Sequence, residues 1–364
     1  MRPDRDLSDP SRPREAGRSR DRDGCARKNR FAALPDAEEE SVSCFPRHVS
    51  VERTNMQFGI VGAGGYWGPN WIRVLKQLNV LGAVCEASPE RMKKVVERFE
   101  LDKTSIPQLN SYDTMLSMDL DGVFVVTSPA SHADLAIQAM NAGKHIFVEK
   151  PLADSLEQCY KIKFEAERLR RIVMVGHTFI YHPAVRMFKE SLPMVGKLRT
   201  LYTVRANFGQ YQQAGVVHDL LPHDLSIFNY LCDGFPDNVQ ADVNPYQDVA
   251  YVTAKYGPVI CNAFLSWGYP DKTRKLSAVG DKGILEWDLN NTHLLFHRKW
   301  TEATAEGRFR HFDEGTQKVM VYDQSEPLMN EALHFMDCIA NNKTPLTGIE
   351  DGINVVKGLE QCHR

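Results

Sequence analysis

The feature that most restricts how this chain can fold is a glycine-rich turn between an apolar strand and an amphipathic helix. Residues 57–61 are an apolar run, glycines gather between residues 62 and 68, and residues 69–78 carry apolar side chains at helical spacing. In such a turn the glycines let the backbone approach a pyrophosphate, and the helix N-terminus offers it unpaired N–H groups. The sequence therefore predicts a dinucleotide site formed by Gly62, Gly64, Gly65, Tyr66, Trp67 and Gly68.

An acidic residue follows where a dinucleotide site requires one. The predicted strand 81–85 ends at Glu86, 22 residues after Gly64. A carboxylate there accepts hydrogen bonds from ribose hydroxyls and repels a 2′-phosphate, which favours NAD over NADP. Gly68 comes one residue later than the third glycine of G-x-G-x-x-G. Glycines that serve only a tight connection are the alternative explanation.

Strands and helices alternate as far as residue 175. We predict helices over 89–99, 130–140 and 155–169, and strands over 122–127, 144–148 and 172–175. Continuous apolar strands between helices indicate a doubly wound parallel sheet of the Rossmann type, whose ligands bind beyond the carboxyl ends of the strands. The residues near these ends are site candidates: Ser128, Pro129, His132, Glu149, Lys150 and His177.

Beyond residue 180 the pattern changes to long alternating runs. We predict strands over 197–208, 249–256, 260–267, 275–279, 283–287 and 293–296, in an antiparallel or mixed sheet. The chain is therefore of the α/β class. We predict a Rossmann domain over 56–177 and a second, C-terminal domain over 178–364.

The first 55 residues differ in composition from the rest of the chain. They contain 12 basic and 11 acidic residues, and few large apolar ones. Such a segment cannot bury enough apolar surface to offset its chain entropy, so we expect it to be disordered. The alternative is that Met56 is the true start and that residues 1–55 are not native to the protein.

One predicted helix in the second half carries a pair of polar residues. It begins near Asp219 and runs to Leu231, and Asp219 and His223 are four residues apart on one helical face. Oxidation of a secondary alcohol needs a base for the hydroxyl proton and a cation at the same oxygen. His223 can be the base and Lys150 the cation, with Asp219 orienting them. The alternative is a purely structural pair, with Asp219 as the helix N-cap.

Several of these residues together resemble the glucose–fructose oxidoreductase, inositol dehydrogenase and rhizopine-catabolism (Gfo/Idh/MocA) family. The resemblance extends from Met56 to the C-terminus and rests on the glycine turn, Ser128-Pro129-x-x-His132, Gly143-Lys144-His145, Glu149-Lys150-Pro151 and Asp219-x-x-x-His223. It implies a C-terminal α+β domain whose large, open, mostly antiparallel sheet often builds a homodimer or homotetramer. It also implies that Lys150, Asp219 and His223 surround the reacting carbon.

A narrower resemblance is to the branch of this family that acts on nucleotide sugars, such as the UDP-N-acetylglucosamine 3-dehydrogenases. It rests on residues 175–186, Arg205-x-Asn207-x-Gly209 and Asp219-Leu220-x-Pro222-His223-Asp224. The resemblance implies further substrate-binding residues at His177, Tyr181, Arg205 and Asn207. Arg205 either pairs with a substrate phosphate or carboxylate, or is a strand-surface arginine in an ordinary ion pair.

Composition limits the partners of the protein. The net charge is −3, from 44 basic and 47 acidic residues, and no apolar run reaches the roughly 20 residues that span a bilayer. We therefore expect neither nucleic acid nor membrane as a partner. The eight cysteines lie scattered and form no CxxC pair, so we expect no metal site and a cytoplasmic protein.

Taken together, the sequence predicts an NAD-dependent oxidoreductase that oxidises, or reversibly reduces, a secondary hydroxyl of a sugar. The substrate expected is a nucleotide sugar of the UDP-N-acetylhexosamine type, reacting at C3. One alternative is a dehydrogenase of inositol or monosaccharides. A second is a dinucleotide-binding regulator without turnover, against which the intact set of Lys150, Asp219 and His223 argues, since a regulator needs no base and cation at one carbon.

Overall fold

This computed structural model describes residues 55–209, 214–289, 294–302, 310–313 and 315–362. The expectation for residues 1–55 therefore lies outside the described residues, except at Asn55. No described helix combines the length and the apolar character that crossing a membrane would require.

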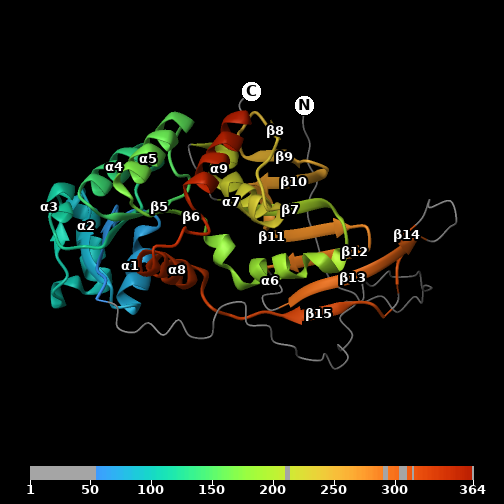
Figure 1. The fold of residues 1–364 in the computed structure, drawn as a ribbon, viewed down its shortest axis with the longest axis horizontal. Coiled ribbons are helices and arrows are strands. Elements are labelled where there is room, and N and C mark those ends of the chain that lie inside the picture. The colour runs from blue at the N-terminus through green and yellow to red at the C-terminus, as the bar shows by residue number, and fades with distance from the viewer. Residues whose placement is uncertain (1–54, 210–213, 290–293, 303–309, 314, 363–364) are drawn as a thin grey trace, which may run out of the picture. The chain divides into compact units, whose positions relative to one another are not determined.

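The first half folds as the predicted doubly wound sheet (Figure 1). Six strands pair in the order β3-β2-β1-β4-β5-β6, and every pair is parallel. The strands are β1 (Phe58–Val61), β2 (Leu81–Cys85), β3 (Gln108–Leu109), β4 (Gly122–Val125), β5 (His145–Glu149) and β6 (Val173–Gly176). The helices between them are α1 (Gly68–Gln77), α2 (Pro89–Phe99), α3 (Tyr112–Leu116), α4 (His132–Asn141) and α5 (Leu156–Leu169).

Alternate residues of the central strands enter two different apolar cores. Ile60 and Phe124 pack in one core with side chains of α1 and α2, whereas Val61 and Val125 pack in the other with side chains of α3, α4 and α5. The sheet is thus covered on both faces, which explains why its strands are apolar without alternation. The strand order reverses between β1 and β4, and in such sheets this is where a ligand crevice opens.

The second half forms a nine-stranded sheet in the order β14-β13-β12-β11-β7-β10-β9-β8, with β15 pairing β13. Among the described strand pairs of this second sheet, only β7 and β10 are parallel, so the sheet is mostly antiparallel, as predicted. The strands are β7 (Leu198–Phe208), β8 (Asn238–Val243), β9 (Val249–Tyr256), β10 (Val259–Ser266), β11 (Gly268–Gly280), β12 (Gly283–Asp288), β13 (Leu294–Glu302), β14 (Arg310–Phe312) and β15 (Lys318–Val321).

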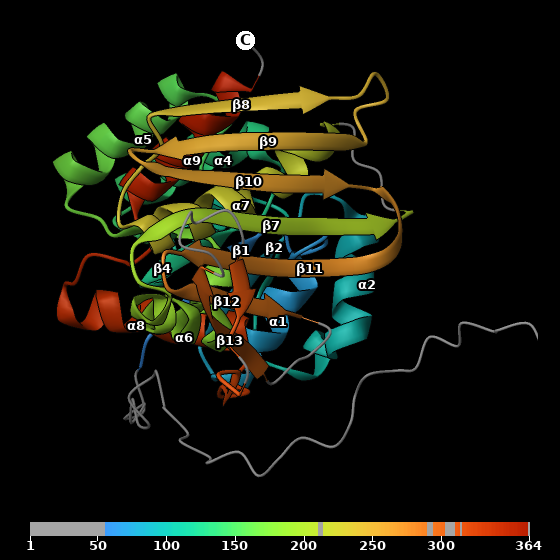
Figure 2. The same cartoon turned by 90° about the vertical axis from the view of Figure 1, so that its right-hand side faces the viewer.

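Helices cover one face of this second sheet, and no helix of the described residues covers the other, which we call the open face (Figure 2). Contacts with the strands come from α6 (Pro183–Ser191), α7 (Gly215–Cys232) and α9 (Ile349–Gln361). Along β7 the residues alternate, so that Leu201 is buried and Tyr202 exposed. Tyr251 of β9 is also exposed, and its ring lies 5.0 Å from that of Phe264 on β10. The open face is therefore partly aromatic.

The C-terminal helices α8 (Pro327–Asn341) and α9 return to the first sheet. The backbone N–H of Val175 in β6 donates to the carbonyl of Thr347 over 2.8 Å, and α9 packs closely enough that a Cβ on Gly352 would lie 2.8 Å from Cβ of Leu152. The predicted division at residue 177 falls between β6 and β7. Elements on both sides of that division nevertheless share a core, so the division remains a prediction.

The helix that carries Asp219 and His223 begins earlier than predicted. It is α7, which starts at Gly215, with Ala214 as its N-cap residue. Gly215 has a φ of +80°, a conformation that favours glycine and that turns the chain into the helix. Asp219 is therefore inside the helix, and its alternative reading as the N-cap is wrong.

Candidate active site

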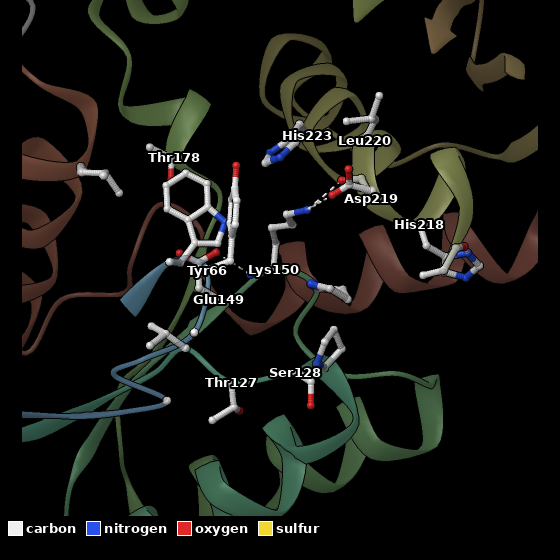
Figure 3. A pocket seen from close by; sticks show the side chains of 18 of the residues that line it. Tyr66, Thr127, Ser128, Glu149, Lys150, Thr178, His218, Asp219, Leu220 and His223 are labelled. Atoms are coloured by element: carbon white, nitrogen blue, oxygen red, sulfur yellow. Dashed lines mark hydrogen bonds and ion pairs between the residues drawn. The ribbon is translucent and has the colours of Figure 1, made fainter. Parts of the chain in front are cut away.

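A cavity of about 1620 Å³ lies beyond the carboxyl ends of β1, β4 and β5 and extends to α7, β7 and β11. It is lined by residues from both halves of the chain (Figure 3). The predicted residues on its wall are Gly62, Gly65, Tyr66, Trp67, Glu86, Ser128, Pro129, Glu149, Lys150, Arg205, Asn207, Asp219 and His223.

The glycine turn has the geometry of a dinucleotide cradle. Gly62 has a φ of +86°, and a Cβ there would lie 2.8 Å from Cγ2 of Thr127. Gly68 opens α1, and a Cβ on it would lie 2.2 Å from the carbonyl oxygen of Ala63, so the helix packs directly on the turn. Gly64 and Gly68 are behind the wall, whereas Gly62 and Gly65 line the cavity. Because the helix can start at Gly68, the extra residue in the glycine spacing is accommodated, and the turn fits a pyrophosphate.

Glu86 lies at the end of β2 with its carboxylate already engaged. Its Oε2 accepts a hydrogen bond from the backbone N–H of Gly64 over 2.9 Å, and its Oε1 accepts from that of Ser88 over 3.0 Å. Nη2 of Arg91 lies 2.9 Å from Oε1 in an ion pair. Glu86 is 3% exposed, whereas the Arg91 side chain is 56% exposed. Arg91 is a cavity residue that sequence reasoning missed.

Lys150 and Asp219 meet across the cavity. Lys150 directly follows β5. Its Nζ donates a hydrogen bond to the backbone carbonyl of Asp219 over 2.7 Å and another to Oδ1 of Asp219 over 3.2 Å. Both side chains are largely buried. In Figure 3 the lysine side chain reaches toward Asp219, and the ring of His223 lies on the same helix close by. The tertiary structure thus brings the three predicted catalytic residues together.

His223 lies in a site that disfavours its protonated form. Its ring meets that of Phe179 edge-on, with centroids 5.2 Å apart, and its buried Nδ1 has no hydrogen-bond partner among the described residues. Burial, with the charges of Lys150 and Arg205 next, holds the pKa of His223 well below its usual value. The imidazole is therefore neutral near pH 7, which is the form that can accept a proton.

Glu149, which precedes Lys150, is a buried carboxyl at the floor of the cavity. The indole of Trp71 donates to its Oε1 over 2.8 Å, and the backbone N–H of Lys150 donates to its Oε2 over 3.2 Å. Burial raises the pKa of Glu149 despite these hydrogen bonds. Trp71 itself is fully buried.

Three further predicted site residues, in addition to Gly64 and Gly68, lie behind the cavity wall. His132 is buried, with its ring nitrogens 2.9 Å and 3.2 Å from the carbonyls of Pro151 and Thr127. The hydroxyl of Tyr181 lies 3.0 Å from that of Thr347. His177 is fully buried with no partner for either ring nitrogen among the described residues. None of the three lines the cavity, because a place near a strand end in the sequence does not fix the depth of a side chain.

Arg205 lines the cavity and is held by an ion pair within the protein. It is 4% exposed, so it is not a surface arginine, and its Nε and Nη2 bind Oδ2 and Oδ1 of Asp224 over 2.9 Å and 3.2 Å. Its guanidinium also lies over the ring of Phe179, 4.3 Å from the centroid. The positive charge of Arg205 is therefore balanced by the carboxylate of Asp224, a residue of α7.

Sequence reasoning missed other residues of the cavity wall. They include Thr127, Thr178, Trp267, Lys272 and Arg274. The last three belong to β10–β11, whose place beside β7 no local pattern reveals. Within the described ranges, no group of three or more His, Cys, Asp or Glu side chains is arranged to hold a metal ion.

Comparison with known proteins places this geometry among oxidoreductases. Residues 56–177 match the NAD-binding Rossmann fold of the Gfo/Idh/MocA oxidoreductase family, and residues 196–364 match its C-terminal alpha/beta domain. An inositol 2-dehydrogenase/D-chiro-inositol 3-dehydrogenase of Halalkalibacterium halodurans is 28% identical over 186 residues, which make up 49% of this chain and 53% of that protein. The match thus spans about half the length of that relative.

Two solved structures share the fold. The UDP-N-acetylglucosamine 3-dehydrogenase of Acidithiobacillus ferrooxidans has a TM-score of 0.72 and 22% identity, over 84% of this chain and 96% of that one. A levoglucosan dehydrogenase in complex with NADH and levoglucosan has a TM-score of 0.72 and 17% identity, over 85% and 96%. At these identities the likeness concerns the fold alone.

Proposed function

The chain belongs to the Gfo/Idh/MocA oxidoreductase family, and we propose that it is an NAD-dependent dehydrogenase that oxidises a secondary hydroxyl of a sugar, or reduces the corresponding ketone. The substrate that we propose is a UDP-N-acetylhexosamine, reacting at C3. The observation that carries the proposal is that the ammonium group of Lys150 and the neutral imidazole of His223 line the same cavity as the glycine turn.

The cofactor would be held by the strand ends of the first sheet. Gly62 and Gly65, with the backbone N–H groups of Tyr66 and Trp67, would receive the pyrophosphate. Ser128 and Pro129 line the cavity beyond β4. NAD, when bound, accepts the hydride that leaves the alcohol carbon. Every proton and charge that remains must be managed by side chains of the protein.

His223 would take the hydroxyl proton. Since Nδ1 of the ring is buried, we assign Nε2 as the nitrogen that accepts it. The low pKa of His223 keeps this nitrogen unprotonated. Lys150 would place its ammonium against the developing alkoxide, and such a preorganised charge is effective where water is excluded. Asp219 holds the ammonium in position through its carbonyl and carboxylate oxygens.

The choice of NAD over NADP is supported by Glu86, whose buried carboxylate would face the ribose hydroxyls. The ion pair of Glu86 with Arg91 also bears on the choice of cofactor, because a guanidinium is suited to binding the 2′-phosphate of NADP. While Arg91 is held by the carboxylate, the pair presents no free cation to a 2′-phosphate. We therefore propose NAD as the preferred cofactor.

Steady-state assays of NADH formation test the substrate proposal. Purified protein would be given UDP-N-acetylglucosamine and, separately, myo-inositol, with the oxidised product identified by mass spectrometry. We expect turnover of the nucleotide sugar and a product two mass units lighter. Activity on inositol alone would favour the alternative that the Halalkalibacterium halodurans relative suggests. Tight NAD binding without turnover of any alcohol would favour a regulator.

A further inference from the structure

Arg274 is a cation of the cavity wall that forms no ion pair with a carboxylate of the described residues. It lies on β11 directly opposite Arg205 of β7, so the two guanidinium groups are on the same face of the sheet. Arg205 has Asp224 as its bidentate partner. Arg274 donates only to neutral oxygens: Nη1 to the carbonyls of Ala206 and Thr273, over 2.7 Å and 2.8 Å, and Nη2 to Oδ1 of Asn207 over 3.1 Å.

The nearest carboxylates are each committed to another cation. Asp219 holds Lys150 and Asp224 holds Arg205, although both attract the guanidinium of Arg274 through space. Three cations therefore share two carboxylates at this end of the cavity. Lys272 also lines the cavity, is exposed, and forms no ion pair with the described residues.

Two donors of Arg274 remain for a ligand. A guanidinium has five N–H donors, and three are accounted for by these contacts. The Nε–H and one N–H of Nη2 have no partner among the described residues, and these donors can form the fork that matches a carboxylate or phosphate. Burial and the charge of Arg205 lower the pKa of Arg274 to about 10, so it is still protonated near pH 7.

We infer that Arg274, assisted by Lys272, binds an anionic oxygen group carried by the sugar substrate. This group is either a phosphate of a nucleoside diphosphate or a sugar carboxylate. The inference rests on the proposed function in that both concern one cavity. It moves the predicted anion-binding role from Arg205, which Asp224 neutralises, to the arginine on the neighbouring strand. A neutral sugar would leave the fork of Arg274 without an anion and would gain nothing from Lys272.

The test compares ligands that differ in charge. Dissociation constants would be measured by calorimetry, with NADH present, for UDP, UDP-N-acetylglucosamine, glucuronate and neutral N-acetylglucosamine. They would be measured on the unaltered protein, on Arg274→Met and on Arg274→Lys. Arg199→Met is the matched control, because Arg199 is an exposed arginine of β7 that does not line the cavity. Arg274→Met should weaken an anionic ligand by roughly 10- to 100-fold more than the neutral one.

The outcomes separate the sources of the anion. A selective loss for UDP ligands identifies a diphosphate, and a selective loss for glucuronate identifies a carboxylate. Arg274→Lys should recover part of the loss, and higher salt should weaken anion binding in the unaltered protein. An equal loss for charged and neutral ligands, or no loss, would overturn the inference. Charge-selective binding without oxidation of any sugar would instead leave the anion site standing and refute the proposed dehydrogenase.

A pH profile gives a second readout that a structural role of Arg274 would not move. Burial is the main cause of the low pKa of His223, and the charge of Arg274 is the smallest of the charges that add to it. Its removal in Arg274→Met should raise that pKa, so the acid limb of kcat/KM should shift to higher pH. Arg199→Met should leave the profile unchanged. An unshifted profile in Arg274→Met would place the guanidinium too far from the reacting centre for the proposed role.

Discussion

The amine of Lys150 lies 2.7 Å from the backbone carbonyl oxygen of Asp219, so the end of a Rossmann strand is tied to a helix that covers the second sheet. The carboxylate of Asp219, at 3.2 Å, adds an ion pair to this hydrogen bond. A charge held at two points has little freedom to move, and catalysis by a fixed charge depends on such preorganisation. Several testable consequences follow from the groups around this contact.

Substitution of Lys150 should affect turnover far more than cofactor binding. Lys150→Met keeps the length of the side chain and removes its charge, so the alkoxide loses its cation. We expect kcat to fall by about 10²- to 10³-fold, as when one charge-stabilising donor is removed from an enzyme. The dissociation constant of NADH, measured by fluorescence, should change little. Lys161→Met, at an exposed ion pair of α5, is the control. A kcat near that of the unaltered protein would exclude the lysine from the mechanism.

His223 should support the reaction at unusually low pH. A base works in its deprotonated form, which predominates above its pKa. Because burial and nearby cations hold the pKa of His223 well below its usual value, kcat/KM should remain level as pH falls through about 6.5. His223→Ala should reduce kcat by about 10²- to 10⁴-fold. An acid limb centred near 6.5 in the unaltered protein would show that His223 is not the titrating base.

Stability should decline with acid below the ordinary pKa of histidine. Burial lowers the pKa of His177 to about 3 and that of His182 to about 4. Below about pH 6.5 the unfolded chain binds protons at these residues while the folded chain does not, so stability is lost as pH falls. Each group adds up to about 1.4 kcal/mol per pH unit to the slope of the unfolding free energy.

The histidine effect can be isolated in one variant. In His177→Asn the unfolding free energy should change less steeply with pH between about 6.5 and 4, because His177 no longer contributes to the slope. Equilibrium unfolding by denaturant, repeated at several pH values, measures this slope. His311→Asn, at an exposed histidine of β14, is the control variant. Equal slopes in all three proteins would mean that His177 is protonated in the folded state.

The cofactor preference should depend on Glu86. Glu86→Gln removes the carboxylate from the ribose site and releases Arg91 from its ion pair. NADH binding should weaken relative to NADPH binding by about tenfold, the equivalent of one charge-assisted hydrogen bond. Fluorescence titration with both cofactors measures the ratio. Glu90→Gln, at an exposed residue of α2, serves as the control. The same factor for both cofactors would show that Glu86 does not face the ribose.

The open face of the second sheet is the surface that we propose for self-association into a homodimer or homotetramer. Tyr251 on this face is 62% exposed and contacts Phe264. A lysine at such a position would have to lose its hydration in an interface, so Tyr251→Lys should lower the mass measured by light scattering. Tyr160→Lys on α5, at a tyrosine of similar exposure, should not. A monomer in the unaltered protein would refute the oligomer outright.

Local sequence patterns were sufficient for most of the first sheet and for the chemistry of its strand ends. The apolar runs before Gly62 and Lys150 became β1 and β5 because strand and helix periodicities depend on residues close in the chain. The two-residue strand β3 and the five-residue helix α3 were missed, since elements so short carry too few residues to show a period. Helices α6 and α8 were also absent from the prediction.

The sequence by itself determined the glycine turn, the parallel sheet, and the pairing of Asp219 with His223 one helical turn later. Only the tertiary structure decided that Asp224 neutralises Arg205, that Tyr181 faces Thr347, and that Arg274 stands in the cavity. The physical reason is that local conformation is set by neighbours along the chain, whereas burial and charge balance are set by side chains from distant strands and helices. Those neighbours exist only once both sheets have packed.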